Sequence, residues 1–181
     1  MIKDSGNRRE FDSGAVRDMQ EGKGRCDLMP LDVVGKLMDT HQICDKIITA
    51  IALFQESFDV KYLYRALRIF ADLREWSNPT MILEVAKHFE EGCKKYGEDN
   101  WRKGIPVKCY IDSAVRHYLK WLRGDTDEMH DRAFCWNVMC CIWTYEHLEK
   151  GTHSERCVVC DVDIPEGRQV CLNCEKEGEE K

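Results

Sequence analysis

Apolar residues recur at helical spacing through most of the middle of this chain. In the stretch 42–57, for example, Ile47, Ile51 and Phe54 fall on one face of a helix. Glycine and proline residues interrupt the pattern, and helices commonly begin and end beside them. The pattern predicts helices over residues 31–40, 42–57, 59–75, 80–96, 109–123 and 127–149. Because no convincing strand pattern occurs among them, the predicted fold class is all-α, a helical bundle.

The two ends of the chain depart from this pattern. The first 30 residues are polar, and Gly14, Gly22 and Gly24 interrupt any period, so we expect an extended, loop-like arm. After Gly151 the composition changes abruptly, which indicates a linker and a second module. The predicted organisation is an arm over residues 1–30, a helical domain over 31–150 and a small module over 151–181.

The last module contains two CxxC pairs separated by ten residues. Each CxxC turn presents two thiolates, and four thiolates form the tetrahedral set that Zn²⁺ prefers. Because a segment this short cannot bury a hydrophobic core, metal binding would supply its folding free energy. We therefore predict a structural zinc ribbon, with a redox or disulfide pair as the alternative. Its four ligands are Cys157, Cys160, Cys171 and Cys174.

Composition and charge exclude several classes of protein. The 181 residues are 43% hydrophobic and 33% charged, which is typical of a soluble globular domain with a small appendage. A net charge of −6 argues against stable nucleic-acid binding. No run of 18 apolar residues occurs, so no membrane association is expected. The N-terminus lacks an apolar signal segment, and most cysteines outside the CxxC pairs lie in apolar context, so we expect reduced thiols and a cytoplasmic protein.

Carboxylates recur inside helices that otherwise have the pattern of core helices. Glu91, Asp112, Glu128 and Asp131 are candidate ligands for divalent metal. Glu128 and Asp131 are three residues apart, so both can reach one ion. Asp131 also lies on a helix side that becomes apolar, where a carboxylate is costly unless it is paired or liganded. The alternative for Asp112 is an ordinary surface pair with Arg116, four residues on.

Basic residues accompany these acids and suggest an anionic ligand. Lys95 and Arg116 are spaced to meet an anion, and the Gly-Lys-Gly-Arg stretch brings Lys23 and Arg25 close to phosphates through a glycine-rich backbone. Trp101 stands in a polar loop, where it either plugs the end of the bundle or stacks a nucleobase. Acids and bases in this arrangement favour metal-assisted phosphate chemistry over a plain bundle.

Several stretches together resemble a known family. In chain order they are FDSGAVRD, GKGRCDLMP, HFEEGCKKYGEDNWRKGIP, YIDSAVRHYLKWLRGDTDE and WN. They resemble the phage-associated dATP/dGTP diphosphohydrolase family, which is related to the MazG-like all-α nucleoside triphosphate pyrophosphatases. The resemblance covers residues 11–31 and about 81–147. It implies hydrolysis of a purine deoxynucleoside triphosphate to the monophosphate and pyrophosphate, with Mg²⁺ or Mn²⁺ held by acidic residues of neighbouring helices.

The resemblance also implies roles for individual residues. MazG-like enzymes carry EExxE on one helix and ExxD on the next. Glu128-Met-His-Asp131 matches the second motif, whereas Glu90-Glu91 lacks the third glutamate, which Asp112 is a candidate to replace. The predicted metal ligands are Glu91, Asp112, Glu128 and Asp131; the catalytic residues are Glu91, Glu128, Asp131 and Lys95; the substrate-binding residues are Lys23, Arg25, Asn100, Trp101, Arg116, His130 and Asn137.

Two questions stay open at this level. The apolar faces of 42–57 and 59–75 fit either an intrachain core or the homo-dimer or homo-tetramer interface that the resemblance implies. The rival function is a non-catalytic helical protein whose zinc ribbon docks a replication or transcription partner. A nucleotide phosphatase is a second rival, distinguished by its product.

Overall fold

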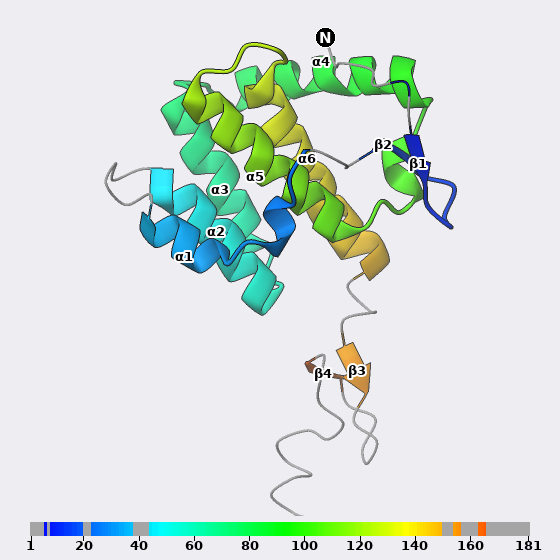
Figure 1. The fold of residues 1–181 in the computed structure, drawn as a ribbon, viewed down its shortest axis with the longest axis horizontal. Coiled ribbons are helices and arrows are strands. Elements are labelled where there is room, and N and C mark those ends of the chain that lie inside the picture. The colour runs from blue at the N-terminus through cyan, green and yellow to red at the C-terminus, as the bar shows by residue number, and fades with distance from the viewer. Residues whose placement is uncertain are drawn as a thin grey trace, which may run out of the picture.

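The structure is a computed structural model, and it describes residues 6, 8–19, 23–37, 44–149, 154–156 and 163–165 (Figure 1). The predicted all-α class is confirmed for the main domain. The helices are α1 (Leu31–Leu37), α2 (Cys44–Ser57), α3 (Lys61–Leu73), α4 (Asn78–Tyr96), α5 (Val107–Arg123) and α6 (His130–Thr144), with a π-helical turn over Tyr145–Glu149 and a 3₁₀ turn over Asn100–Lys103. None of these helices is long and apolar enough to cross a membrane.

Helix ends follow the capping chemistry of the sequence. α4 begins at Asn78, two residues earlier than predicted, because the Ser77 side chain accepts a hydrogen bond from the Thr80 amide and Pro79 suits a first turn. It ends at Gly97, whose φ of +87° suits a residue without a side chain. α6 begins three residues later than predicted, at His130, and neither Asp125 nor Thr126 caps it.

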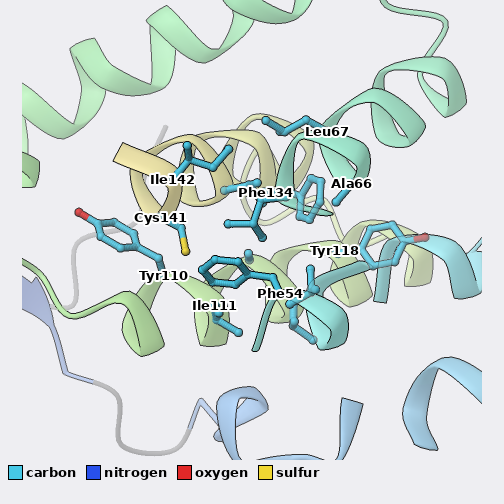
Figure 2. Packing of buried hydrophobic residues seen from close by; sticks show 14 of the residues in the cluster. Phe54, Ala66, Leu67, Tyr110, Ile111, Tyr118, Phe134, Cys141 and Ile142 are labelled. Atoms are coloured by element: carbon cyan, nitrogen blue, oxygen red, sulfur yellow. The ribbon is translucent and has the colours of Figure 1, made fainter. Parts of the chain in front are cut away.

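The core lies between α5, α6 and the pair α2–α3 (Figure 1). Figure 2 shows Phe54 of α2, Leu67 of α3 and Phe134 of α6 in one cluster of buried side chains. The rings of Phe70 and Phe134 lie 4.6 Å apart between centroids. The apolar faces of α2 and α3 are therefore buried within a single chain, which answers one question that the sequence left open.

The N-terminal arm is more ordered than the predicted extended loop. Strand β1 (Arg8–Glu10) pairs antiparallel with β2 (Val16–Asp18), and a 3₁₀ turn follows over Cys26–Leu28. Gly14, with φ of +76°, makes the tight connection possible. Ala15 and Cys26 are buried, so the arm packs onto the helical domain. Three-residue strands are too short to give a hydrophobic period, which is why the sequence did not predict them.

The C-terminal module is described only in part. Strands β3 (Ser154–Arg156) and β4 (Asp163–Pro165) pair antiparallel. Cys157, Cys160, Cys171 and Cys174 lie outside the described residues, so the zinc ribbon stays a prediction. Within the part of the chain that is described, the free cysteines are Cys26, Cys93, Cys109, Cys135, Cys140 and Cys141.

Candidate functional site

A cavity of about 820 Å³ lies where the arm meets the helical domain. The hairpin β1–β2 is placed beside the C-terminal end of α4 (Figure 1), and the cavity continues along α5 to the start of α6. This volume falls within the range of small-molecule sites, about 300–1,000 Å³. Charged residues on its walls include Arg9, Arg17, Lys23, Arg116, Lys120, Asp18, Asp112, Asp127 and Glu128.

Buried hydrogen bonds hold the arm in place as one wall of the cavity. The Asn100 side chain bonds both backbone groups of Val16: Oδ1 accepts from the amide at 2.9 Å and Nδ2 donates to the carbonyl at 2.9 Å. The amide of Cys26 donates to Asp112 Oδ1 at 2.7 Å. Asn100 was predicted to bind substrate; here it lines the cavity and anchors the arm.

Arg17 is a half-buried cation on the cavity wall. Its Nη2 donates to Asn137 Oδ1 at 2.6 Å, and its guanidinium lies over the Tyr110 ring at 4.9 Å from the centroid. Nη1 is buried without a hydrogen-bond partner, and no carboxylate of the described residues pairs with this arginine. Burial lowers the pKa of Arg17. An anionic ligand in the cavity would supply the missing counter-charge.

The neighbouring Asp18 binds two lysines through one oxygen. Lys95 Nζ lies 2.8 Å from Asp18 Oδ2, and Lys23 Nζ lies 3.8 Å from the same atom. Only 6% of the Lys95 side chain is exposed, and Lys95 does not line the cavity although it was predicted to be catalytic. Asp18 Oδ1 is buried and has no hydrogen-bond partner among the described residues.

The pair of Asp112 and Arg116 is buried, not on the surface. Arg116 Nη1 donates to Asp112 Oδ2 at 2.6 Å, and Nη2 donates to Ser113 Oγ at 2.9 Å. Asp112 is 2% exposed, and both of its oxygens accept hydrogen bonds, because Oδ1 takes the Cys26 amide. Arg116 is thereby fixed on the cavity wall with its charge largely compensated.

Two histidines form a hydrogen-bonded chain beside the cavity. His117 Nδ1 lies 2.9 Å from His130 Nδ1, and His130 Nε2 lies 2.8 Å from Asp127 Oδ1. Lys120 Nζ is 3.1 Å from the other Asp127 oxygen, and these two contacts lower the pKa of Asp127. Glu128 Oε2 lies 3.9 Å from His117 Nδ1.

The contacts within this chain of hydrogen bonds determine which histidine nitrogens carry protons. An ionised Asp127 accepts only, so His130 Nε2 carries a proton and, in neutral His130, Nδ1 offers a lone pair. The short Nδ1–Nδ1 contact then requires a proton on His117 Nδ1. Burial, followed by the Arg116 charge and by His130, lowers the pKa of His117 well below its usual value.

An aromatic wall closes the cavity on the α4 side. Trp101 packs edge-on against Phe89 at 5.4 Å and against Trp143 at 4.9 Å between centroids, so it plugs the bundle end and also faces the cavity. Trp136 lies 5.5 Å from the His88 ring. Burial lowers the pKa of His88 to about 4, so this side chain is neutral at pH 7.

The predicted site residues divide into two groups. Those that line the cavity are Lys23, Asn100, Trp101, Asp112, Arg116, Glu128 and Asn137; those that do not are Arg25, Glu91, Lys95, His130 and Asp131. Arg25 pairs with Asp27 at the surface. Asp131 pairs with Arg74 of α3, 3.0 Å away. Arg25, which was predicted to bind substrate, and Asp131, which was predicted to bind metal, thus each pair with another side chain of the protein.

The four predicted metal-ligand carboxylates do not form a close group within the described ranges. The groups of histidine and acidic residues that do bring their ligand atoms within 4.8 Å of one another are His117–Glu128–His130 and Asp125–Asp127–His130. Asp112 and Asp131 are each held by an arginine instead. Glu128 is thus the predicted ligand that both lines the cavity and belongs to such a group.

Sequence reasoning assigned no site role to Asp18 or His117, and it left Arg17, a cation among the glycines of the arm, out of the predicted substrate-binding residues. Arg17 and Asp18 belong to a three-residue strand, and no period marks them. A usable signal was present, since the two charges follow directly on an apolar pair, Ala15 and Val16. His117 is largely buried and bonded to His130, as a core histidine would be, and it also lines the cavity.

Fold and site together define an all-α protein with a cavity between its arm and its bundle, lined by charged residues of both signs. The model of one protein family, described as dATP/dGTP diphosphohydrolase, N-terminal, matches residues 64–155, just over half of the chain. The chain belongs to this family, which supports a hydrolase of nucleoside triphosphates. Neither a curated protein nor a solved structure matches the chain significantly.

Proposed function

We propose that this protein hydrolyses dATP and dGTP to the deoxynucleoside monophosphate and pyrophosphate. The observation that carries the proposal is the half-buried Arg17 of the cavity wall, whose Nη1 is buried without a hydrogen-bond partner and whose guanidinium has no carboxylate beside it in the described structure. A desolvated charge without a counter-charge destabilises the folded protein. A bound anionic ligand that neutralises the charge removes this destabilisation. The family membership identifies that ligand's class as a nucleoside triphosphate.

Four of the cations on the cavity walls suit a polyphosphate. Arg17 enters from β2, Lys23 from the segment after it, and Arg116 and Lys120 from α5. Arg116 and Lys120 are each already paired with a carboxylate, whereas Arg17 is paired with none among the described residues. A bound phosphate would therefore stabilise the Arg17 charge most. Arginine also binds phosphate through two parallel N–H donors, which fixes orientation as well as charge.

The aromatic wall is the proposed base subsite. Trp101, Phe89 and Trp136 line the cavity. A purine offers a larger surface for stacking than a pyrimidine does, and base–aromatic stacking contributes about 1–3 kcal/mol per base. Asn137, held by Arg17 and by the Ala133 carbonyl, is the nearby amide that we propose contacts base or sugar.

The chemical step needs a water molecule that attacks the α-phosphorus in line with the bridging oxygen to the β-phosphorus. We propose that Asp18 Oδ1 takes the proton from this water, because it is a buried carboxylate oxygen on the cavity wall without a hydrogen-bond partner in the described residues. The water oxygen bonds to the α-phosphorus, the α–β bridging bond breaks, and Arg17 and Arg116 stabilise the leaving pyrophosphate. Lys95 holds Asp18 in place.

We propose that Mg²⁺ or Mn²⁺ is required, as the family resemblance implies. The predicted set of four carboxylates does not fit one ion, because Asp112 and Asp131 are each held by an arginine. Glu128 fits, since it lines the cavity and no lysine or arginine in the described part of the chain pairs with it. A bound ion would neutralise phosphate charge and acidify a coordinated water.

The test is turnover of a panel of deoxynucleoside and nucleoside triphosphates with Mg²⁺ or Mn²⁺, with products separated by chromatography. We expect dATP and dGTP to give the monophosphate and pyrophosphate. Arg17→Met should lower kcat/KM about 10- to 100-fold, because a charge-assisted hydrogen bond contributes about 1.5–3 kcal/mol. Arg65→Met, on the exposed side of α3, is the matched control.

Three outcomes would contradict the proposal. Folded protein that turns over no triphosphate with either ion would remove the enzymatic function and favour the interaction protein. Release of inorganic phosphate in place of pyrophosphate would assign a phosphatase. Equal activity of Arg17→Met and the unmodified protein would exclude Arg17 from substrate binding.

A further inference from the structure

We propose that His117, His130 and Glu128 form a binding site for a first-row transition-metal ion at the edge of the cavity. Their ligand atoms lie within 4.8 Å of one another, with His117 Nδ1 2.9 Å from His130 Nδ1 and 3.9 Å from Glu128 Oε2. The metal-binding part of this inference stands on geometry alone; its link to hydrolysis rests on the proposed function.

The two nitrogens are almost at the separation that a metal requires. Two imidazole ligands at 2.0–2.1 Å from a tetrahedral ion are about 3.3 Å apart. The observed separation is 2.9 Å, so a small rotation of either ring admits the ion. At present a proton must lie between the two Nδ1 atoms, since two lone pairs repel. A metal ion takes the place of that proton, and His117 then carries its proton on Nε2.

Asp127 gives the site the outer partner that histidine ligands usually have. It accepts a hydrogen bond from His130 Nε2 at 2.8 Å, and Lys120 fixes its second oxygen at 3.1 Å. A carboxylate on the far nitrogen fixes the tautomer, orients the ring and increases the basicity of the ligating nitrogen. His130 is therefore already in the form that presents Nδ1 to an ion.

Both histidines are shielded from bulk solvent. His117 and His130 are both largely buried, with 15% and 1% of their side chains exposed. The Arg116 charge that faces His117 is offset by Asp112.

The donor set indicates the class of metal. Two imidazole nitrogens and one carboxylate suit Mn²⁺, Co²⁺, Ni²⁺ and Zn²⁺, whereas Mg²⁺ prefers oxygen ligands and retains several waters. Because Glu128 and His117 both line the cavity, an ion here would lie beside the bound triphosphate. The structure thus assigns a nitrogen-containing site in place of the all-carboxylate set that the sequence suggested.

The test uses the full chain, loaded with Zn²⁺ and freed of excess metal so that the predicted cysteine module is occupied. Co²⁺ is then added without nucleotide, and proton NMR in water records paramagnetically shifted imidazole N–H signals. We expect two exchangeable signals, one from the Nε2–H of each ligating histidine. Cysteine ligands cannot give such signals, so the readout separates this site from the C-terminal module.

Five variants complete the experiment. His117→Gln and His130→Gln should each abolish the paired signals, and His147→Gln, an exposed histidine stacked on Trp143, should retain both. Where a buried histidine variant fails to fold by circular dichroism, Glu128→Gln and Asp127→Asn decide the matter. Both should keep the signals and weaken Co²⁺ binding, by about 10- to 100-fold for the outer carboxylate.

Two results would overturn the inference: no shifted N–H signal in excess Co²⁺, or signals and affinity that are unchanged in every one of these variants. Hydrolysis is measured separately. Metal binding without turnover would refute the proposed function alone, and turnover without histidine-dependent Co²⁺ binding would refute this inference alone.

Discussion

The side-chain amide of Asn100 pairs with the backbone of Val16 as another strand would. Its Oδ1 accepts from the Val16 amide and its Nδ2 donates to the Val16 carbonyl, both at 2.9 Å. The two residues following Val16 are Arg17 and Asp18, which face the cavity. A single side chain of the helical domain thus determines the position of the two arm residues on which the proposed chemistry depends.

Replacing Asn100 should therefore release the arm without unfolding the helices. Asn100→Ala removes two buried hydrogen bonds, worth about 2 kcal/mol together. We expect faster hydrogen exchange at the Val16 amide, at least a 10-fold loss of kcat/KM and an unchanged helical circular dichroism spectrum. Asn100→Asp should act similarly, because it retains the acceptor but sets a carboxylate against the Val16 carbonyl. Exposed Asn78→Ala is the control, and unaltered exchange at Val16 would contradict the anchoring role.

Protonation of His88 should destabilise the protein in acid. Its pKa is about 4 in the folded state and near 6.5 when unfolded, so between these values the unfolded chain binds more protons. The free energy of unfolding should fall as pH decreases from 6.5 to 4, by about 3 kcal/mol from this group. The measurement is urea unfolding of the protein and of His88→Gln at several pH values. Parallel pH profiles for the two proteins would show that His88 does not contribute.

Asp131 should matter for stability more than for metal binding. It joins α6 to α3 through Arg74 at 3.0 Å and is 6% exposed. Because Arg74 is about one-third exposed, we expect Asp131→Ala to cost only about 2 kcal/mol. Glu90→Ala, which removes the exposed pair with Lys94, should change stability undetectably. Thermal unfolding and Co²⁺ titration check both statements, and loss of metal affinity in a stable Asp131→Ala protein would restore its predicted role as a ligand.

The choice of activating ion should follow the donor set of His117, His130 and Glu128. We expect Mn²⁺ to activate hydrolysis at a concentration at least 10-fold lower than Mg²⁺ does, because imidazole nitrogens favour the transition metal. His117→Gln should reduce this difference in activating concentration, because it weakens the binding of Mn²⁺ far more than that of Mg²⁺. Activation curves for both ions, measured at saturating triphosphate, test the expectation. Identical concentration dependence for the two ions would oppose it.

The C-terminal cysteines should bind one zinc ion per chain. Elemental analysis of the purified protein, and of Cys157→Ser with Cys160→Ser, measures this directly. The double variant should lose the zinc but keep the thermal transition of the helical domain, whose core lies between α2, α3, α5 and α6. Zinc content that is independent of both cysteines would reject the ribbon.

The helical fold was largely predictable because its signals are local. Apolar spacing indicated every helix from α1 to α6, and Gly97 and Gly124 marked two of the ends correctly. The start of α6 was wrong because the acidic residues before it pair with side chains: Asp125 with Arg123, and Asp127 with Lys120 and His130. The implied dimer or tetramer remains a prediction.

The cavity was predictable only in part because partners far apart in sequence decide it. Helical spacing correctly joined Asp112 to Arg116, but it could not show that Arg74 neutralises Asp131 or that Asp18 engages Lys95. Nor could it place His117 against His130, since a loop separates α5 from α6. Such pairings arise from packing, and a single sequence gives no period that reveals them.

The hydrogen bond between Arg17 and Asn137 spans 120 positions of the chain. A pocket that joins such remote segments exists only while the hairpin stays docked, and docking depends on a handful of contacts, whereas the bundle depends on an extensive apolar interior. Denaturant should therefore abolish turnover at a concentration well below the one that unfolds the helices. Loss of turnover would then report detachment of the first twenty or so residues, and dilution should restore it quickly.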